Sequence, residues 1–241
     1  MKILLHGASG VMGKNVQAVV SENPDCSIVA GVDRGIHAEE SSAFPVYPDI
    51  KKVKEDFDVI IDFSVKEAVD ALLAFAVEKK KALVLCTTGL SETQLEKIEE
   101  AGRTIPILQS GNMSLGINVL EELLRIAAGK LYQEGFDVEI VEAHHRRKKD
   151  APSGTALMLE KVFQREGQNR PREKDEIGMS SVRGGTIPGV HEVLFAGEDE
   201  VIKLEHTAYS RKIFAKGALS AAFFLLKQKP GRYTMGDVLR K

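Results

Sequence analysis

The sequence predicts an α/β protein: an N-terminal Rossmann-like, doubly wound parallel sheet, followed by a second α+β domain with a mixed or antiparallel sheet. Two observations predict the first part. Short apolar runs alternate with amphipathic helical stretches, and a glycine-rich turn follows the first run. Beyond about residue 178, apolar and polar residues alternate between glycine and proline breaks, a pattern typical of antiparallel strands.

Composition limits the functions that are open to the chain. Its 241 residues, 43% of them hydrophobic, are enough for a sizeable core. The net charge of -2 gives no electrostatic argument for nucleic-acid binding, and no apolar run is long enough to cross a membrane. Cys26 and Cys86 indicate no disulfide framework, and the first residues lack the features of a secretory signal. We therefore expect a cytoplasmic protein without nucleic-acid or membrane partners.

The first strand and helix enclose the glycine turn GASGVMG. Residues 3–5 are continuously apolar, as in a strand buried on both faces, and residues 14–22 are predicted to be helical. Gly7, Gly10 and Gly13 permit a tight turn and let the backbone approach a pyrophosphate at the helix N-terminus. This GxxGxxG spacing is a weak indication by itself, because the commoner motif is GxGxxG.

The next apolar run strengthens the nucleotide prediction. It ends in Asp33, twenty positions after Gly13, where an acid binds the ribose hydroxyls of adenosine. Asp33 favours NADH, whereas the guanidinium of Arg34 could hold the 2′-phosphate of NADPH. We therefore expect NADH, NADPH or both. The alternative is a surface turn that carries a charge pair.

The alternation of strand and helix continues to residue 108. Residues 34–56 are predicted to form an irregular connection with at most short elements. Strands are expected at residues 58–63, 82–85 and 105–108, and helices at residues 65–80 and 91–102. Ser91 and Gln94 are placed for a capping box, and Gly102 for the helix end.

Small polar residues follow two of these strands. Ligands of doubly wound sheets bind at the carboxyl ends of the strands. The residues expected to border the cofactor are therefore Cys86, Thr87, Thr88, Ser110, Gly111, Asn112 and Met113. Cys86 is not favoured as a nucleophile, because no paired base is evident.

The stretch from Glu142 to Ala156, EAHHRRKKDAPSGTA, concentrates the candidate chemistry. A half-buried strand over residues 136–143 leads into a loop with four cations, Arg146, Arg147, Lys148 and Lys149. Ser153 then caps a helix whose expected core-facing residues are Leu157, Leu159, Val162 and Phe163. The N–H groups at this helix start, near Gly154 and Thr155, offer a site for a carboxylate or phosphate.

His144 and His145 lie between that strand and the cationic loop. Imidazole exchanges protons near neutral pH, so a histidine that faces an anionic ligand beside cations is well placed as a general acid. The alternatives are a solvated basic loop and a buried structural histidine. A zinc site is disfavoured, because no further ligands show the required spacing.

The remaining chain completes a two-domain arrangement. The expected elements are a helix over residues 115–132, a polar and mobile segment over 167–178, antiparallel strands within 182–210 and a helix over 211–226 that packs back on the first domain. We assign residues 1–112 and 211–241 to the dinucleotide-binding domain and residues 113–210 to the second domain.

Six motifs together resemble the 4-hydroxy-tetrahydrodipicolinate reductase family over essentially the whole chain: GASGVMG, CTTG, SGNMSLGIN, EAHHRRKKDAPSGTA, VRGG and MGDVL. The fourth motif is highly specific, and the nucleotide motifs are generic. The resemblance implies NAD(P)H-dependent reduction of the cyclic dicarboxylate formed from aspartate semialdehyde and pyruvate. Water is lost, and the product is tetrahydrodipicolinate on the diaminopimelate route to lysine. A cytoplasmic homotetramer assembled through the second, substrate-binding domain is also implied.

The resemblance assigns roles to individual residues. It implies that His144 is the proton donor, that Lys148 is the catalytic lysine, and that His145, Gly154 and Thr155 hold substrate carboxylates. Cofactor contacts are implied for Gly7, Ala8, Ser9, Gly10, Val11, Met12, Asp33 and Arg34, and nicotinamide contacts for Cys86 to Thr88 and Ser110 to Met113. No metal is implied.

Two departures from the family pattern fall beside the expected nicotinamide site. Cys86 replaces a common glycine, and Met113 replaces an aromatic residue whose space its flexible thioether can fill. Cofactor preference is therefore left open. Two other functions also fit the residues: a nucleotide-binding redox sensor that has kept the fold, and an oxidoreductase acting on another small dicarboxylate. The substitution His144→Ala separates enzyme from sensor, because only an enzyme needs the proton donor.

Overall fold

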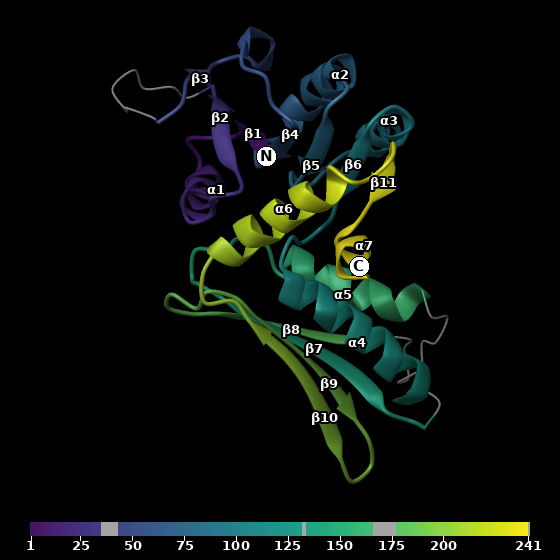
Figure 1. Ribbon diagram of the computed structural model, residues 1–241. Helices are drawn as coiled ribbons and strands as arrows, with labels where there is room; N and C mark the ends of the chain where they lie inside the picture. Colours follow the sequence, from purple (N-terminus) through teal and green to yellow (C-terminus); the bar gives the residue numbers. More distant parts are fainter. Residues whose placement is uncertain (35–42, 132–133, 166–176, 241) are drawn as a thin grey trace. The chain divides into compact units, whose positions relative to one another are not determined.

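The computed structural model describes residues 1–34, 43–131, 134–165 and 177–240 and divides the chain into two compact units (Figure 1). Unit 1 comprises Met1–Ser114 and Arg211–Lys241, and unit 2 comprises Leu115–Ser210. The first boundary thus lies two residues beyond the expected one. Among the described residues, no helix is both long and apolar enough to cross a bilayer.

Unit 1 contains a seven-stranded sheet in the order β11-β6-β5-β4-β1-β2-β3, and all its paired strands are parallel. The strands are β1 (Lys2–His6), β2 (Ser27–Val32), β3 (Val46–Tyr47), β4 (Val59–Asp62), β5 (Ala82–Leu85), β6 (Pro106–Gln109) and β11 (Gly231–Tyr233). The helices are α1 (Val11–Ser21), α2 (Val69–Lys79), α3 (Glu92–Gly102), α6 (Lys212–Leu225) and α7 (Met235–Leu239), with short 3-10 turns at Ile50–Lys52 and Lys66–Ala68.

Both faces of this sheet are covered, which explains the continuous apolar runs of its strands. Ile3 and Leu5 pack into a core with α1 and α6, while Leu4 packs into a second core with α2 and α3 on the opposite face. The Rossmann-like, doubly wound fold is confirmed. From β1 the sheet extends to β2 on one side and to β4 on the other, so the strand order reverses between β1 and β4, where ligands of such sheets bind.

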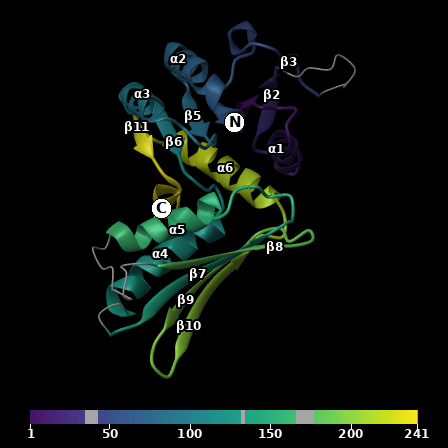
Figure 2. The same ribbon diagram turned by 180° about the vertical axis from the view of Figure 1, so that it is seen from behind.

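Unit 2 is a four-stranded sheet in the order β10-β9-β7-β8, with two helices on one face (Figures 1 and 2). Its elements are α4 (Leu115–Leu131), β7 (Asp137–His144), α5 (Gly154–Arg165), β8 (Gly178–Arg183), β9 (Val190–Ala196) and β10 (Val201–Thr207). Ile140, Val193 and Phe195 point from the strands into the core beneath the helices, which also contains Leu159 and Phe163 of α5. The second α+β domain with a mixed sheet is confirmed.

The pairing of β8 decides between the mixed and the antiparallel sheet, which the sequence left open. β7 pairs with β9 antiparallel but with β8 parallel, because the chain returns through α5 before β8 begins. β8 starts at Gly178, inside the segment expected to be polar and mobile. The rest of that segment, apart from Ile177, lies outside the described residues.

Three further details differ from the sequence-based expectations. Leu157 is 41% exposed rather than in the core, since it lies on the outer side of α5. The helix expected over residues 65–80 begins as a 3-10 turn, so α2 starts only at Val69. The helix end at Gly102 and the capping box of Ser91 and Gln94 are both confirmed. The short elements β11 and α7 were not anticipated.

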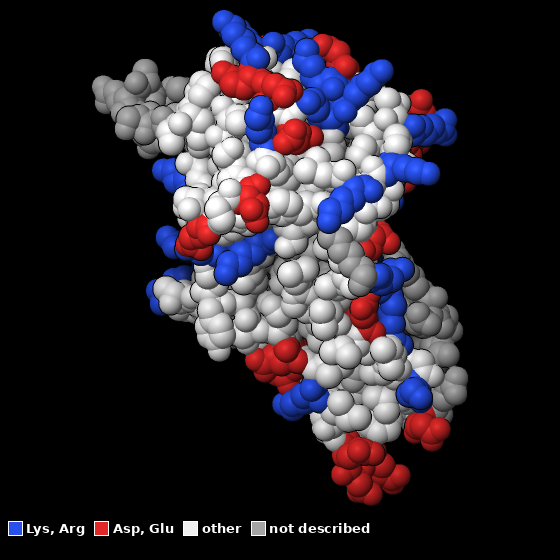
Figure 3. All heavy atoms as spheres, viewed as in Figure 1, with Lys and Arg blue, Asp and Glu red and all other residues white. Residues whose placement is uncertain are grey.

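Charged side chains of both signs are interspersed on the surface shown in Figure 3. Acidic side chains gather at the tip of the β9–β10 hairpin, where the turn carries Glu198, Asp199 and Glu200. Large areas of this face between the charged side chains carry no charge.

Candidate functional site

The glycine turn of unit 1 borders a pocket of about 630 Å³ at the carboxyl ends of β1, β2 and β4. Gly7 has a φ of +82°, and a Cβ there would lie 2.5 Å from the carbonyl oxygen of Phe63. A Cβ at Gly13 would lie 2.3 Å from the carbonyl oxygen of Gly7. The fold itself therefore requires these two glycines, whereas Gly10 has its nearest contact at 3.4 Å and lines the pocket.

Asp33 and Arg34 line the same pocket, so the structure brings these predicted cofactor residues together with Gly7 and Gly10. The backbone N–H of Ser9 donates a hydrogen bond of 2.9 Å to Oδ2 of Asp33, which ties the turn to the end of β2. Gly10 caps α1 without a side-chain hydrogen bond, and no acidic residue stands in the first turn of that helix. The helix start therefore suits a phosphate.

The side chains of the other turn residues lie differently. Ala8 is buried, Met12 packs against the apolar core, and Val11 is 60% exposed. The buried methyl group of Ala8 leaves its backbone for a cofactor contact, whereas Met12 is only partly buried. This pocket fits the nucleotide half of a dinucleotide. Its lining also includes Ser64, whose hydroxyl is buried without a hydrogen-bond partner among the described residues.

The residues predicted to border the nicotinamide are largely committed to protein contacts. Burial raises the pKa of the Cys86 thiol well above its usual range, which fits a small core residue rather than a nucleophile. The Thr87 hydroxyl donates to Asp62 at 2.6 Å, and Met113 is buried in the apolar core. Ser110 donates from its hydroxyl to the Asn112 carbonyl at 3.0 Å. Thr88 and Gly111 are exposed.

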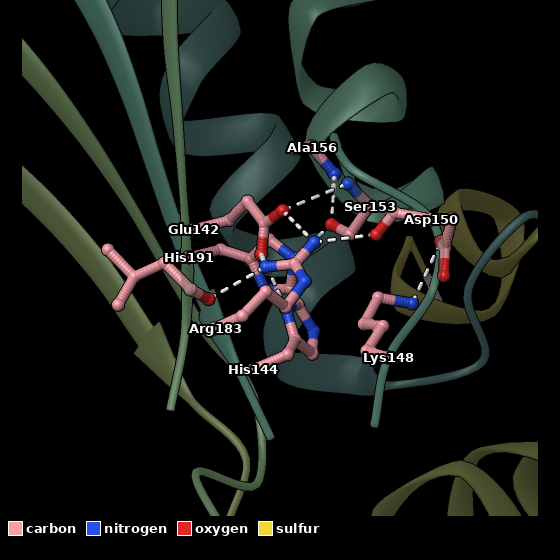
Figure 4. A network of polar contacts seen from close by, with 9 residues as sticks. Glu142, His144, Lys148, Asp150, Ser153, Ala156, Arg183 and His191 are labelled. Atoms are coloured by element: carbon pink, nitrogen blue, oxygen red, sulfur yellow. Dashed lines mark hydrogen bonds and ion pairs between the residues drawn. The ribbon is translucent and has the colours of Figure 1, made fainter. Parts of the chain in front are cut away.

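In unit 2, the candidate proton donor sits at the end of β7 and is held by a buried carboxylate (Figure 4). Nδ1 of His144 lies 2.5 Å from Oε2 of Glu142, which is completely buried. Arg183 donates from Nη1 to Oε2 at 2.7 Å and from Nη2 to Oε1 at 2.6 Å. The N–H of Ser153 donates to Oε1 at 3.1 Å.

The electrostatics of this group define which atoms carry protons. Burial alone would raise the pKa of Glu142, but hydrogen bonds from Arg183, Ser181 and His144 outweigh it and lower the pKa to about 2. Glu142 is therefore ionised and accepts the Nδ1–H of His144. Burial lowers the pKa of His144, although Glu142 opposes this effect. At neutral pH the Nε2 atom of His144 is thus free to gain a proton when an anion arrives.

The start of α5 lies beside this pair, because Glu142 also binds the Ser153 N–H. The Ser153 side chain caps the helix by accepting the N–H of Ala156 at 3.1 Å. Its hydroxyl also lies 2.9 Å from Nε2 of His191. Burial lowers the pKa of His191 to about 4, so Nε2 is an acceptor and the hydroxyl donates to it. A Cβ at Gly154 would meet nothing within 4 Å, so this helix start is open to a ligand.

Lys148 differs from its cationic neighbours. Its ammonium group pairs with Asp150 at 2.8 Å, and its side chain is 22% exposed. Arg146, Arg147 and Lys149 are exposed, as a solvated basic loop predicts. The prediction of a solvated basic loop thus holds for three cations, whereas the ammonium group of Lys148 points to Asp150 (Figure 4).

Two further observations concern the surroundings of His144. Nδ1 of His145 is buried and has no hydrogen-bond partner among the described residues. A Cβ at Gly189, which has a φ of +151°, would lie 3.3 Å from Nε2 of His144, so glycine keeps this nitrogen accessible. Among the described residues, no group of three or more potential ligands could hold a metal ion.

Sequence reasoning missed several of these residues. It did not assign roles to Glu142, Arg183, His191 or Gly189. Glu142 is the first residue of EAHHRRKKDAPSGTA, and Arg183 belongs to VRGG. Their presence in these motifs could have indicated a role in the site. His191 carried none, because an isolated histidine in an alternating strand does not reveal its neighbours.

Comparisons with known proteins agree over the whole chain. The family models described as Dihydrodipicolinate reductase, N-terminus, and Dihydrodipicolinate reductase, C-terminus, match residues 1–113 and 116–239. The 4-hydroxy-tetrahydrodipicolinate reductase of Caldanaerobacter subterraneus subsp. tengcongensis is 50% identical over 253 residues, covering 100% of this chain and 99% of that protein. The enzyme of the same name from Clostridium novyi is 43% identical over 251 residues, covering 99% and 98%.

A solved structure supports the fold independently. The dipicolinate-bound dihydrodipicolinate reductase from Paenisporosarcina sp. TG-14 matches with a TM-score of 0.86 at 23% identity, covering 98% of both chains. Since the family models and close relatives span nearly every residue, the chain belongs to the dihydrodipicolinate reductase family.

Proposed function

We propose that this chain catalyses the NAD(P)H-dependent reduction of 4-hydroxy-tetrahydrodipicolinate to tetrahydrodipicolinate, with loss of water, on the diaminopimelate route to lysine. The observation that carries the proposal is the placement of His144, fixed by buried Glu142, beside the open start of α5. One carboxylate, that of Glu142, therefore holds both the proton donor and the proposed anion site in position. The names of the relatives support the choice of substrate.

The dicarboxylate is proposed to bind at the start of α5. Backbone N–H groups of Gly154 and Thr155 stand at the positive end of the helix dipole and favour a carboxylate. Lys148 adds positive charge, and the unpartnered Nδ1 of His145 provides a further polar contact. That a dihydrodipicolinate reductase was solved with dipicolinate bound supports a small dicarboxylate as the ligand class.

His144 is proposed to deliver the proton from Nε2. Glu142 holds the opposite nitrogen, so the ring has one orientation and Nε2 is the atom that gains and releases the proton. Burial keeps the unliganded imidazole largely neutral, whereas a bound dianion raises its pKa and favours protonation. The donor is therefore charged mainly when substrate is present. Lys148 is the second candidate donor and otherwise neutralises the dianion.

The pocket of unit 1 is proposed to hold the nucleotide through Gly7 to Met12, with Asp33 and Arg34 at the adenosine ribose. When bound, the reduced nicotinamide supplies the hydride for the unsaturated ring carbon. With the proton from His144 or Lys148, the substrate gains one hydride and one proton and loses one water. Cys86 to Thr88 and Ser110 to Met113 remain the proposed nicotinamide contacts.

The proposal also covers the oligomeric state of the protein and its cellular compartment. We infer a homotetramer that forms through unit 2, in the cytoplasm. The resemblance of the whole chain to the reductase family supports this inference. A mass of four chains in light scattering is the expected result, and a monomer would contradict it.

The deciding experiment is a coupled assay. Aspartate semialdehyde, pyruvate and a separate synthase generate the unstable substrate, and oxidation of NADH or NADPH is followed at matched concentrations. We expect turnover with at least one cofactor, and His144→Ala should abolish most of it while cofactor binding is preserved. If cofactor binds but neither supports turnover, the sensor or another dicarboxylate becomes the better explanation. A higher kcat/KM for NADH would assign the preference to Asp33, and for NADPH to Arg34.

A further inference from the structure

One buried carboxylate joins three neighbouring strand ends at the point where the strand order of unit 1 reverses. Asp62, at the end of β4, is completely buried. Its Oδ1 lies 2.8 Å from Nδ1 of His6 at the end of β1 and accepts the Ser64 N–H at 3.2 Å. Its Oδ2 accepts the hydroxyl of Thr87, which follows β5, at 2.6 Å. The cluster therefore links β1, β4 and β5.

The arrangement determines which atom of His6 is left for a ligand. The Thr87 hydroxyl and the Ser64 N–H both donate to Asp62, so the carboxylate accepts and Nδ1 of His6 carries the third donated hydrogen. The opposite ring nitrogen, Nε2, is therefore the atom of His6 that is left for a ligand. His6 is 8% exposed and lines the same 630 Å³ pocket as Gly7, Asp33 and Arg34.

Stability alone does not explain a histidine at this position. The preceding residues of β1 are Ile3, Leu4 and Leu5, all completely buried, and an apolar residue would continue this pattern without the cost of desolvating polar groups. The pocket also contains the buried hydroxyl of Ser64, which lacks a hydrogen-bond partner among the described residues. Unsatisfied polar groups of this kind are expected where a ligand completes the hydrogen bonding.

We propose that His6 is a cofactor-contacting residue that binds the adenosine diphosphate half of the dinucleotide through Nε2, with Asp62 as the residue that positions it. This inference rests on the proposed function. A neutral imidazole accepts a hydrogen bond at Nε2, as a ribose hydroxyl offers, and an imidazolium donates one, as a phosphate oxygen requires. Both groups belong to adenosine diphosphate, and Thr87 ties this contact to the strand end that precedes the proposed nicotinamide contacts.

The test measures binding rather than turnover. NADH, ADP and adenosine are titrated calorimetrically into the wild-type chain and into His6→Asn, without dicarboxylate. Asparagine keeps an N–H donor for Asp62 but has no atom in place of Nε2. We expect the Kd of NADH and ADP to rise about 5- to 10-fold, as loss of one hydrogen bond predicts. If the affinity for adenosine falls by the same factor, the contact is assigned to a ribose hydroxyl. If only the affinities for ADP and NADH fall, the contact is assigned to a phosphate.

Two controls keep the result interpretable. His206→Asn, the same exchange on β10 of unit 2, should leave all three Kd values within about 2-fold, and thermal unfolding should show that both variants are folded. If His6→Asn is folded and binds NADH and ADP as the wild type does, the proposal is wrong. A weaker affinity for NADH with an unchanged affinity for ADP would also overturn the proposal. Because no substrate is present, failure of the reductase assignment would appear separately, as absence of turnover in a wild type that binds NADH.

Discussion

Glu142 shows how much a single buried residue can decide. It accepts hydrogen bonds from His144, Arg183 and the Ser153 backbone, so the proton donor and the start of α5 are held by the same carboxylate. Arg183 also donates to the Asp150 carbonyl at 2.6 Å. A carboxylate that is fully buried is tolerated here because a bidentate guanidinium and donors from His144, Ser153 and Ser181 satisfy its oxygens.

The substitution Glu142→Gln should therefore lower kcat by roughly 10- to 100-fold, the range for losing a partner that orients an active residue. Glu142 raises the pKa of His144 against the effect of burial. Without that charge, the pKa of His144 falls further, and the decline of kcat with rising pH should move to lower pH. Steady-state kinetics across pH measure both effects.

Asp137→Asn provides the matched control for this substitution, since it neutralises an exposed acid on the same strand. It should leave the pH profile in place. The Kd of NADH should be unchanged in both variants, because Glu142 belongs to unit 2. An unaltered pH profile in Glu142→Gln would show that His144 is not the group whose protonation controls the rate.

At the scale of whole elements, glycines distinguish a tightly packed helix face from an exposed one. A Cβ at Gly217 of α6 would lie 1.7 Å from the carbonyl oxygen of Met113. α6 lies against the parallel sheet, and Ala215, Ala218 and Ala222 around this glycine are all completely buried. Gly129, near the end of α4, is exposed, and a Cβ there would meet nothing within 4 Å.

The same substitution should therefore have opposite effects in the two helices. Gly217→Ala should reduce the free energy of unfolding by about 1–3 kcal/mol, because the backbone of Met113 cannot move away without strain. Gly129→Ala should increase it by about 0.5–1 kcal/mol, since alanine loses less conformational entropy in a helix. Urea unfolding of both variants measures these changes. If Gly217→Ala also increased the free energy of unfolding, helix propensity would outweigh packing at this position.

For the whole molecule, buried groups of unit 2 govern stability in acid. Burial lowers the pKa of His191 from 6.5 to about 4, and burial also lowers the pKa values of His144 and His206. The pKa of Glu142 falls from 4.5 to about 2. In each case the unfolded chain binds a proton at a higher pH than the folded chain does. Stability is therefore fully present above the unfolded pKa and is lost as the pH falls.

Acidification should consequently destabilise the chain in two overlapping windows. Between pH 6.5 and about 4, His191 contributes a loss of up to about 3 kcal/mol, at 1.36 kcal/mol for each pKa unit. Between pH 4.5 and about 2, Glu142 adds a loss of similar size. Urea unfolding followed by circular dichroism at several pH values measures the slope. In His191→Asn the first part of that slope should shrink, and an unchanged slope would contradict this account.

The sequence was sufficient to predict most elements of unit 1. Its strands are buried on both faces, so their apolar runs are continuous. Helix α3 also carries a clear start signal in the capping box of Ser91 and Gln94. The parallel pairing of β8 with β7 was not predictable, because strand direction within a sheet depends on how the chain returns and not on local pattern. β11 has only three residues, too few to show a periodicity.

By itself, the sequence determined the fold class, the glycine turn with Asp33 and Arg34, and the stretch with His144, Lys148 and the start of α5. Local pattern contains that information, because the fold class follows from the periodicity of successive segments, and each of the two sites lies on adjacent elements of the chain. The tertiary structure alone decided that Glu142 binds Arg183, which lies 41 positions further along the chain, as well as His144. It also decided that Asp62 joins His6 to Thr87. Such contacts form between neighbouring strands, and their partners are separated in sequence by the helices and connections that the fold places between them.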